Sequence, residues 1–300
     1  MYWFLYCLLY LLSLLPFSVL YGISDFAVFI LYQVAGYRKK VVMENIYRAF
    51  PEKSEAERKK IALQFYRNLV DNFLETFKML SMSKASMEKR ALFDLAEVRE
   101  MIGRGKNIVF LSGHQMNWEW GPWALASGIS IPLLGPYMRI ASDAVNRLFL
   151  KIRGRTGLIL VDATKFSTTI TRVSKGQHAI GLIADQSPST EQKTNWMYFF
   201  GEATPFAVGP EKRAKQTKAA VFFVDFIKIR RGHYLYKAEL ISEDGSLNDK
   251  GEIMRAYRDM LEASVRKQPS NYLWSHKRWK RKYDSTHLEN WIDNKPAPLN

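Results

Sequence analysis

The chain opens with a long run of apolar residues. Residues 1–24 carry no charged side chain, Asp25 is the first, and apolar character continues until the basic cluster at residues 38–40. About 20 apolar residues suffice to cross a bilayer. A cleavable signal peptide usually starts with positive charge and ends at a small-residue cleavage site, and neither feature is evident here. We predict an uncleaved membrane anchor over residues 1–36, and Pro16 leaves open whether it is a single span or a hairpin.

The pattern then changes to that of an amphipathic helix. Ser54 and Glu57 have the spacing of a capping box at a helix N-terminus. Apolar residues recur at helical spacing on one face of this segment, namely Ile61, Phe65, Leu69, Phe73 and Phe77. We predict a helix up to about Leu80 and a second helix over about residues 87–103.

Strand-like and helix-like segments alternate through the rest of the chain. The predicted strands are Asn107–Leu111, Ile131–Gly135, Leu158–Val161, Ala179–Ala184, Ala219–Arg230 and His233–Ile241, the last two joined by a turn at Arg231-Gly232. The predicted helices begin near Trp118 and cover about Ser142–Arg153, Thr164–Ser174 and Asp249–Lys267. Such alternation is typical of an α/β fold with a largely parallel central sheet flanked by helices. We expect one main domain over residues 37–290 and a loose tail over residues 291–300.

Charge narrows the choice of partner. The 300 residues contain 44 Lys and Arg against 29 Asp and Glu, a formal net charge of +15. Such an excess predicts an acidic partner: anionic lipid, a phosphate-bearing substrate, an acidic protein or nucleic acid. Cys7 is the only cysteine, which excludes an intrachain disulfide and any multi-cysteine metal site.

The strongest candidate for chemistry lies where the strand ending at Leu111 delivers His114 to the edge of the sheet, with Glu119 five residues later. Ligands of open α/β sheets bind at the carboxyl ends of strands. Histidine can take a proton near neutral pH, and a carboxylate can orient its ring. Because residues five apart point away from each other on a helix, we expect His114 and Glu119 to meet across a turn. The alternative is a structural or solvated histidine.

Further polar residues could complete such a site. Arg139, Arg153 and Arg155 belong to a central arginine cluster, and arginines bind phosphate or stabilise an oxyanion. An exposed basic helix face is the alternative for part of that cluster. Asp185-Gln186 ends the predicted strand Ala179–Ala184, so it falls on the same sheet edge as His114 if the sheet is parallel. A simple turn before Pro188 is the alternative reading of this Asp.

Near the C-terminus, residues 271–282 alternate aromatic and basic side chains. This pattern suits single-stranded nucleic acid or a membrane–water interface, and the apolar N-terminus favours the membrane. Phosphate-binding loops, dinucleotide-binding glycine motifs and the H-E-x-x-H metal helix are absent from the sequence. We therefore expect no cofactor, no metal and no nucleic-acid partner.

These segments together resemble a family. The resemblance is to the bacterial lipid A late acyltransferases, the lauroyl/myristoyl transferases, and it extends over nearly the whole chain. It is carried by the N-terminal anchor, the motif His114-Gln115-Met116-Asn117-Trp118-Glu119, the segment Arg153–Gly157, Asp185-Gln186 and the Tyr272–Lys280 stretch. The His-x4-Asp/Glu spacing alone is shared with glycerolipid acyltransferases generally. Met116 stands where the family commonly has glycine.

The resemblance implies a glycerolipid-acyltransferase-like fold at the bacterial inner membrane, with the catalytic domain facing the cytoplasm. It implies transfer of an acyl chain from acyl carrier protein or coenzyme A to a hydroxyl of a lipid A precursor or related anionic envelope lipid. A lysophospholipid or aminolipid acceptor, or a non-catalytic lipid-binding role, is the alternative. The expected site comprises His114 as general base and Glu119 as its partner, with substrate or oxyanion contacts from Arg155, Asn117, Asp185, Gln186 and Arg139.

Overall fold

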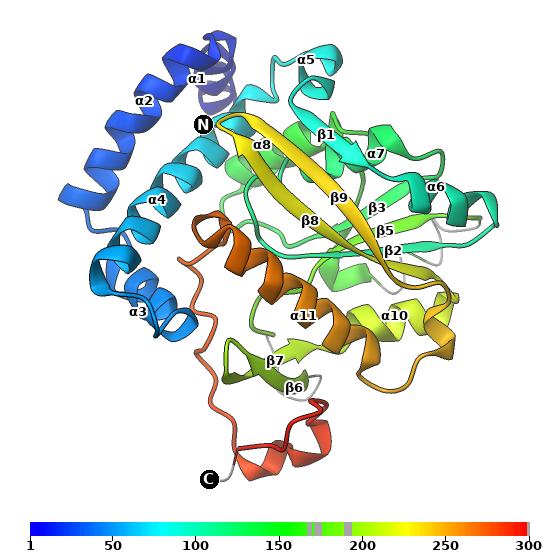
Figure 1. Cartoon of the computed structure of the whole chain (residues 1–300). Coiled ribbons are helices and arrows are strands. Elements are labelled where there is room, and N and C mark those ends of the chain that lie inside the picture. Colours follow the sequence, from blue (N-terminus) through cyan, green and yellow to red (C-terminus); the bar gives the residue numbers. More distant parts are fainter. Residues whose placement is uncertain (167–169, 171–175, 189–193, 299–300) are drawn as a thin grey trace.

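A seven-stranded sheet forms the centre of the computed structural model, which describes residues 1–166, 170, 176–188 and 194–298. Its strands are β1 (Ala91–Asp94), β2 (Ile108–Ser112), β3 (Leu133–Tyr137), β4 (Ile159–Asp162), β5 (Ala179–Ile183), β8 (Ala220–Arg230) and β9 (His233–Ser242). They lie in the order β1-β9-β8-β2-β5-β3-β4 (Figure 1), and every pairing is parallel except that of β8 with β9. The predicted α/β fold with a largely parallel sheet and a β8–β9 hairpin is confirmed.

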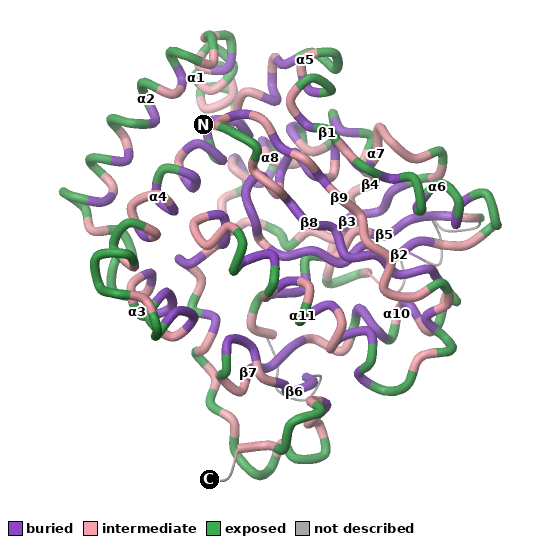
Figure 2. Tube along the Cα trace, in the orientation of Figure 1, coloured by how far each residue is buried: buried purple, intermediate pink, exposed green. Residues whose placement is uncertain are grey.

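Helices cover both faces of this sheet. They are α3 (Lys39–Ala49), α4 (Glu55–Lys78), α5 (Lys84–Glu88), α6 (Ala96–Gly103), α7 (Gly121–Gly128), α8 (Asp143–Gly154), α10 (Gly209–Thr217) and α11 (Glu252–Lys267). Strand β2 is buried along its whole length (Figure 2), as expected of a central strand covered on both faces. Because alternate side chains of a strand point to opposite faces, Val109 and Leu111 join the core under α4 and α11, whereas Ile108 and Phe110 join the core under α6, α7 and α8.

The apolar N-terminus forms two helices that lie along α4 (Figure 1). Helix α1 covers Tyr2–Leu14, and α2 covers Phe17–Phe29 and continues through a π-helical turn, Ile30–Val34. Residues 17–34 are long and apolar enough to cross a membrane. One face of α2 buries Leu20, Ser24 and Val28 against the body, and the other face is exposed. The exposed apolar side chains of the two helices include Trp3, Phe4, Leu8, Leu11, Val19, Ile23, Phe26 and Phe29.

Helix α4 begins at the predicted capping box, in which Ser54 and Glu57 exchange hydrogen bonds. The helix predicted over residues 87–103 is wrong in its first half, because residues 91–94 form the edge strand β1 and only α6 is helical beyond it. The helix predicted over Thr164–Ser174 falls mostly outside the described residues. A small hairpin of β6 (Thr194–Phe199) and β7 (Glu202–Ala207) was not predicted.

The expected loose tail over residues 291–300 is corrected at its start, where Ile292 and Asp293 attach to the domain. Ile292 is buried in the main core, and its backbone N–H donates to the carbonyl oxygen of Trp196 at 2.9 Å. The carboxylate of Asp293 accepts a hydrogen bond from Arg258 at 2.7 Å. One apolar and one charged anchor therefore attach this segment to the domain, and the polar composition of its last residues did not reveal them.

Candidate active site

His114 lies two residues beyond the end of β2, in a loop that runs to the start of α7 at Gly121. Residues 113–120 are not helical, so the helix predicted from near Trp118 begins three residues later, at Gly121. Gly113 packs closely against α11: a Cβ atom at this position would lie 2.5 Å from Cδ1 of Leu261, and that side chain would have to shift. The strand and the glycine together place the imidazole at the carboxyl edge of the sheet.

Asp185 holds both the ring and the backbone of His114. It follows β5, which pairs in parallel with β2 so that Ser112 and Ile183 are partners, and the two loops leave the sheet side by side. Nδ1 of His114 lies 2.6 Å from Oδ1 of Asp185, and the His114 backbone N–H donates to Oδ2 at 3.0 Å. The expectation that Asp185 shares a sheet edge with His114 is confirmed.

The buried environment of Asp185 favours its charged form. Burial of the carboxylate, which is 2% exposed, works to raise the pKa of Asp185, but the charge and the two hydrogen bonds of His114, with the charge of Arg278, outweigh it and lower that pKa below its ordinary value. An ionised carboxylate accepts hydrogen bonds only. A neutral His114 ring that donates its Nδ1–H to this carboxylate carries its lone pair on Nε2.

Nε2 of His114 faces the open side of the site. The side-chain amide nitrogen of Gln186 lies 3.3 Å from it, and the ring of Trp118 packs edge-on with centroids 5.7 Å apart. The His114 side chain is 19% exposed, so a substrate hydroxyl can reach this nitrogen. The geometry is that of a general base oriented by a carboxylate.

Glu119 faces the same cavity as His114 but has a different partner. Its carboxylate accepts two hydrogen bonds from Arg153, at 2.9 Å from Nε and 2.5 Å from Nη2. Among the described residues, no hydrogen bond joins Glu119 to the His114 ring. The expected orienting role of Glu119 is thus corrected: Asp185 already occupies Nδ1, and the turn after His114 directs Glu119 toward the last turn of α8, where Arg153 lies.

Asn117 supports the loop from within the protein. It is fully buried, its Oδ1 accepts from the backbone N–H groups of Glu119 and Trp120, and its Nδ2 donates to Oε2 of Glu75 at 2.8 Å. The expected substrate contact of Asn117 is therefore corrected to a structural one. Glu75, on α4, also accepts from Tyr21 on α2 and from Tyr234 on β9. Its burial raises the pKa of this carboxyl.

Two of the expected arginines lie away from the cavity. Arg155 is exposed beyond the end of α8 and donates to the carbonyl oxygen of Met82 at 3.4 Å. Arg139 is exposed and pairs with Asp143 at 2.7 Å. Arg153 is the cluster member that reaches the site, and the sequence offered one signal for it: Arg153 lies inside the predicted helix, whereas Arg155 lies past its end.

Behind these polar groups is an apolar cavity of about 430 Å³. His114, Glu119, Arg153 and Gln186 line its polar part. Its apolar lining comes from the sheet and the helices over it, including Phe110, Leu125, Leu133, Leu158, Leu182 and Phe226. Gly135 on β3 and Gly181 on β5 also line it and place no side chain in the space. Such a cavity can hold a hydrocarbon chain with its reactive end at His114.

Within the described ranges, no group of three or more His, Cys, Asp or Glu side chains is arranged to hold a metal ion. His114 and Asp185 bond each other, and Glu119 is neutralised by Arg153.

The chain is similar to known proteins over most of its length. A family model described as bacterial lipid A biosynthesis acyltransferase matches residues 1–281. The chain is 21% identical over 276 residues to the lipid A biosynthesis lauroyltransferase of Escherichia coli (strain K12), across 91% of this chain and 89% of that protein. Among solved structures, the chain has a likeness to the crystal structure of the 1-acyl-sn-glycerophosphate (LPA) acyltransferase of Thermotoga maritima. The two chains are 13% identical with a TM-score of 0.38, and the match covers 91% of this chain and 100% of that one.

Proposed function

The chain belongs to the bacterial lipid A biosynthesis acyltransferase family, and from this premise we propose that it transfers a fatty acyl chain from an acyl thioester to a hydroxyl group of a lipid A precursor or a related envelope lipid. One observation carries the proposal: Nε2 of His114, oriented by Asp185, opens onto an apolar cavity whose polar end also holds the Glu119–Arg153 pair.

In the proposed reaction, the acceptor hydroxyl is the nucleophile. Nε2 of His114 removes its proton as the oxygen attacks the thioester carbonyl carbon, and Asp185 stabilises the imidazolium that forms. The tetrahedral intermediate collapses with cleavage of the C–S bond, and the departing thiolate takes the proton from His114. The product is an ester and a free thiol, and no acyl-enzyme is formed.

Arg153 is our candidate for stabilising the charge that develops on the carbonyl oxygen. Its guanidinium has five N–H donors, and Glu119 accepts from only two of its nitrogens. Glu119 and burial fix its position before substrate arrives, and a preorganised cation beside a developing oxyanion is an effective catalytic device. The Gln186 side-chain amide, close to Nε2, is a second polar contact for substrate.

The apolar cavity is our candidate for the acyl-chain site. Each buried methylene contributes about 0.8 kcal/mol to binding. The side chains around it can therefore select among chain lengths. The donor carrier we propose is acyl carrier protein or coenzyme A, and the net charge of +15 suits both an acidic carrier and an anionic lipid acceptor.

The N-terminal helices provide the membrane location. Helix α1 has 13 residues, and at 1.5 Å per residue its length of about 20 Å is short of a hydrocarbon core of about 30 Å. Ser24 and Asp25 bind α2 to the body through Asp71 and Arg231. We therefore propose that both helices lie in one leaflet as a hairpin, with their exposed apolar faces in lipid. The basic residues 38–40 favour a catalytic domain facing the cytoplasm at the inner membrane.

Mass spectrometry of envelope lipids tests the function in cells. A strain lacking the protein is compared with the same strain carrying the wild-type chain or His114→Ala. We expect lipid A to lose one acyl chain without the protein, and the wild type alone to restore it. An unchanged lipid A with an altered phospholipid or aminolipid would reassign the acceptor, and full restoration by His114→Ala would contradict the mechanism.

A further inference from the structure

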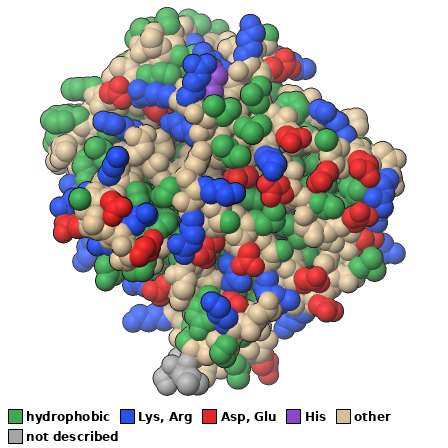
Figure 3. Space-filling model, viewed as in Figure 1, with side chains coloured by type: hydrophobic (Ala, Val, Ile, Leu, Met, Phe, Trp, Pro, Cys, Tyr) green, Lys and Arg blue, Asp and Glu red, His purple; other side chains and the backbone are tan. Residues whose placement is uncertain are grey.

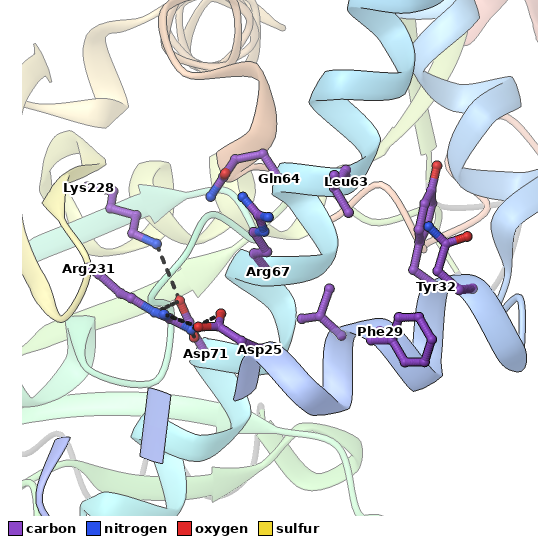
Figure 4. A pocket seen from close by; sticks show the side chains of 11 residues that line it. Asp25, Phe29, Tyr32, Leu63, Gln64, Arg67, Asp71, Lys228 and Arg231 are labelled. Carbon is purple, nitrogen blue, oxygen red and sulfur yellow. Dashed lines mark hydrogen bonds and ion pairs between the residues drawn. The ribbon is translucent and has the colours of Figure 1, made fainter. Parts of the chain in front are cut away.

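A second cavity, of about 610 Å³, shares no lining residue with the acyl-chain cavity. Helix α2 and its π-helical turn form one wall, α4 forms another, and the tip of the β8–β9 hairpin closes one end (Figure 4). The cavity therefore sits where the proposed membrane hairpin joins the body of the protein.

The two ends of this cavity differ in chemistry. Figure 4 shows the charged side chains at one end, with Asp71 between Arg231 and Lys228, and Phe29 and Tyr32 at the other. Phe29 is 56% exposed although it is a large apolar side chain. A ligand that fits both ends must be amphipathic, with a polar head and a hydrocarbon part.

The charged end keeps donors available for an anion. Arg231 uses its guanidinium on Asp71, Asp25 and the backbone of Tyr21, so its role is structural. The Lys228 ammonium donates to Asn68 at 2.8 Å and lies 3.7 Å from Asp71. Among the described residues, no hydrogen bond or ion pair engages the guanidinium of Arg67.

Charge balance points to a singly charged anion. The cavity is lined by three cations, Arg67, Lys228 and Arg231, and by two carboxylates, Asp25 and Asp71. Their charges sum to one positive charge. Burial lowers the pKa of Lys228, and a bound anion would favour its charged form. Figure 3 has the same view as Figure 1. On the left side, where α2 and α4 lie, it shows further Lys and Arg side chains beside exposed apolar ones.

We propose that this cavity binds an anionic glycerophospholipid of the surrounding membrane, with its phosphodiester on Arg67 and Lys228 and its hydrocarbon part along Phe29 and Tyr32. The proposal rests on the membrane location of α1 and α2 and does not depend on the catalytic mechanism. Arg67 can bind two phosphate oxygens at once, and this geometry suits a phosphodiester. A bound lipid would attach α2 to α4 and to the hairpin tip at the same point.

Native mass spectrometry of the full-length chain in a nonionic detergent tests this site. The probes are phosphatidylglycerol, which carries one negative charge, and phosphatidylcholine, which carries none overall. We expect tighter binding of phosphatidylglycerol, and about a tenfold loss of that affinity in Arg67→Gln. Arg67 is exposed, so the substitution should leave folding intact. Lys212→Gln removes one exposed cation from α10, across the molecule in Figure 1, and should bind as the wild type does.

Three results would overturn the proposal: equal binding of the two lipids, equal losses in Arg67→Gln and Lys212→Gln, or displacement of phosphatidylglycerol by an equal concentration of glycerol 3-phosphate. The last would show that the apolar end contributes nothing. His114→Ala should bind phosphatidylglycerol normally, so a failure of the proposed catalysis and a failure of this site give different results.

Discussion

Replacing Asp185 by asparagine separates two accounts of the catalytic histidine. The carboxylate accepts hydrogen bonds from Nδ1 and from the backbone N–H of His114, at 2.6 and 3.0 Å. Asparagine has nearly the same shape, but it carries no charge and its amide nitrogen can donate. If that nitrogen faces Nδ1, the ring proton moves to Nε2 and the base is lost.

The structure sets the size of the effect. A hydrogen bond to a charged group contributes about 1.5–3 kcal/mol, which corresponds to about 10- to 150-fold in rate if it is realised fully in the transition state. Loss of the correct tautomer removes general-base catalysis altogether, about 10²- to 10⁴-fold. We therefore expect kcat to fall at least about tenfold in Asp185→Asn, with little change in KM.

The assay measures acyl transfer by the purified full-length chain, with a lauroyl-loaded acyl carrier protein as donor and a lipid A precursor as acceptor. Asp162→Asn is the matched control, because Asp162 ends β4 at the same sheet edge and bonds only Thr164 among the described residues. The double variant with His114→Ala should lose little more than His114→Ala alone. Activity of Asp185→Asn within about twofold of Asp162→Asn would refute the orienting role, since even a weak charged bond is worth more.

Three further changes test other parts of the structure. Arg153→Lys keeps the charge but removes the two-point bond to Glu119, so kcat/KM should fall about tenfold or more, and wild-type kinetics would contradict the role of the pair. Glu75→Ala leaves Tyr21, Asn117 and Tyr234 without their buried acceptor. Each unpaired buried donor costs about 1–3 kcal/mol, so urea unfolding should show a large loss of stability. An unchanged urea midpoint would contradict the structural role of Glu75. Burial lowers the pKa of His276 from 6.5 to about 4, so the unfolded state binds more protons between these pH values and the stability of the protein falls as the pH drops from 6.5 toward 4. His276→Gln should lose less stability across this pH window than the wild type does. Identical stability–pH profiles of the two proteins would exclude the effect.

The alternation of strands and helices was enough to predict the sheet and the edge at which His114 and Asp185 meet. Parallel neighbours bring their carboxyl ends together, so two polar residues that follow apolar runs become close in space. The sequence could not show which carboxylate bonds the imidazole. Glu119 is nearer along the chain, but the course of the loop places its carboxylate at Arg153.

Other details depended on contacts between distant segments. Arg153 and Arg155 are two residues apart, and on a helix they would point about 200° apart, so a small uncertainty in where α8 ends decides which reaches the cavity. Asn117 bonds Glu75, 42 residues earlier, and nothing in the local pattern indicates that contact. Strand β1 has only four residues, too few for a two-residue period to stand out within a helix-like segment.

The most direct test of the central claim is transfer of a labelled lauroyl group from acyl carrier protein by the purified full-length chain, in detergent, followed by mass spectrometry of lipid and protein. The account predicts that the lipid A precursor gains one acyl chain with the wild type and not with His114→Ala, and that the protein carries no acyl group when the acceptor is omitted. Transfer by His114→Ala at the wild-type rate, or an acylated protein that passes its chain to the lipid, would contradict it.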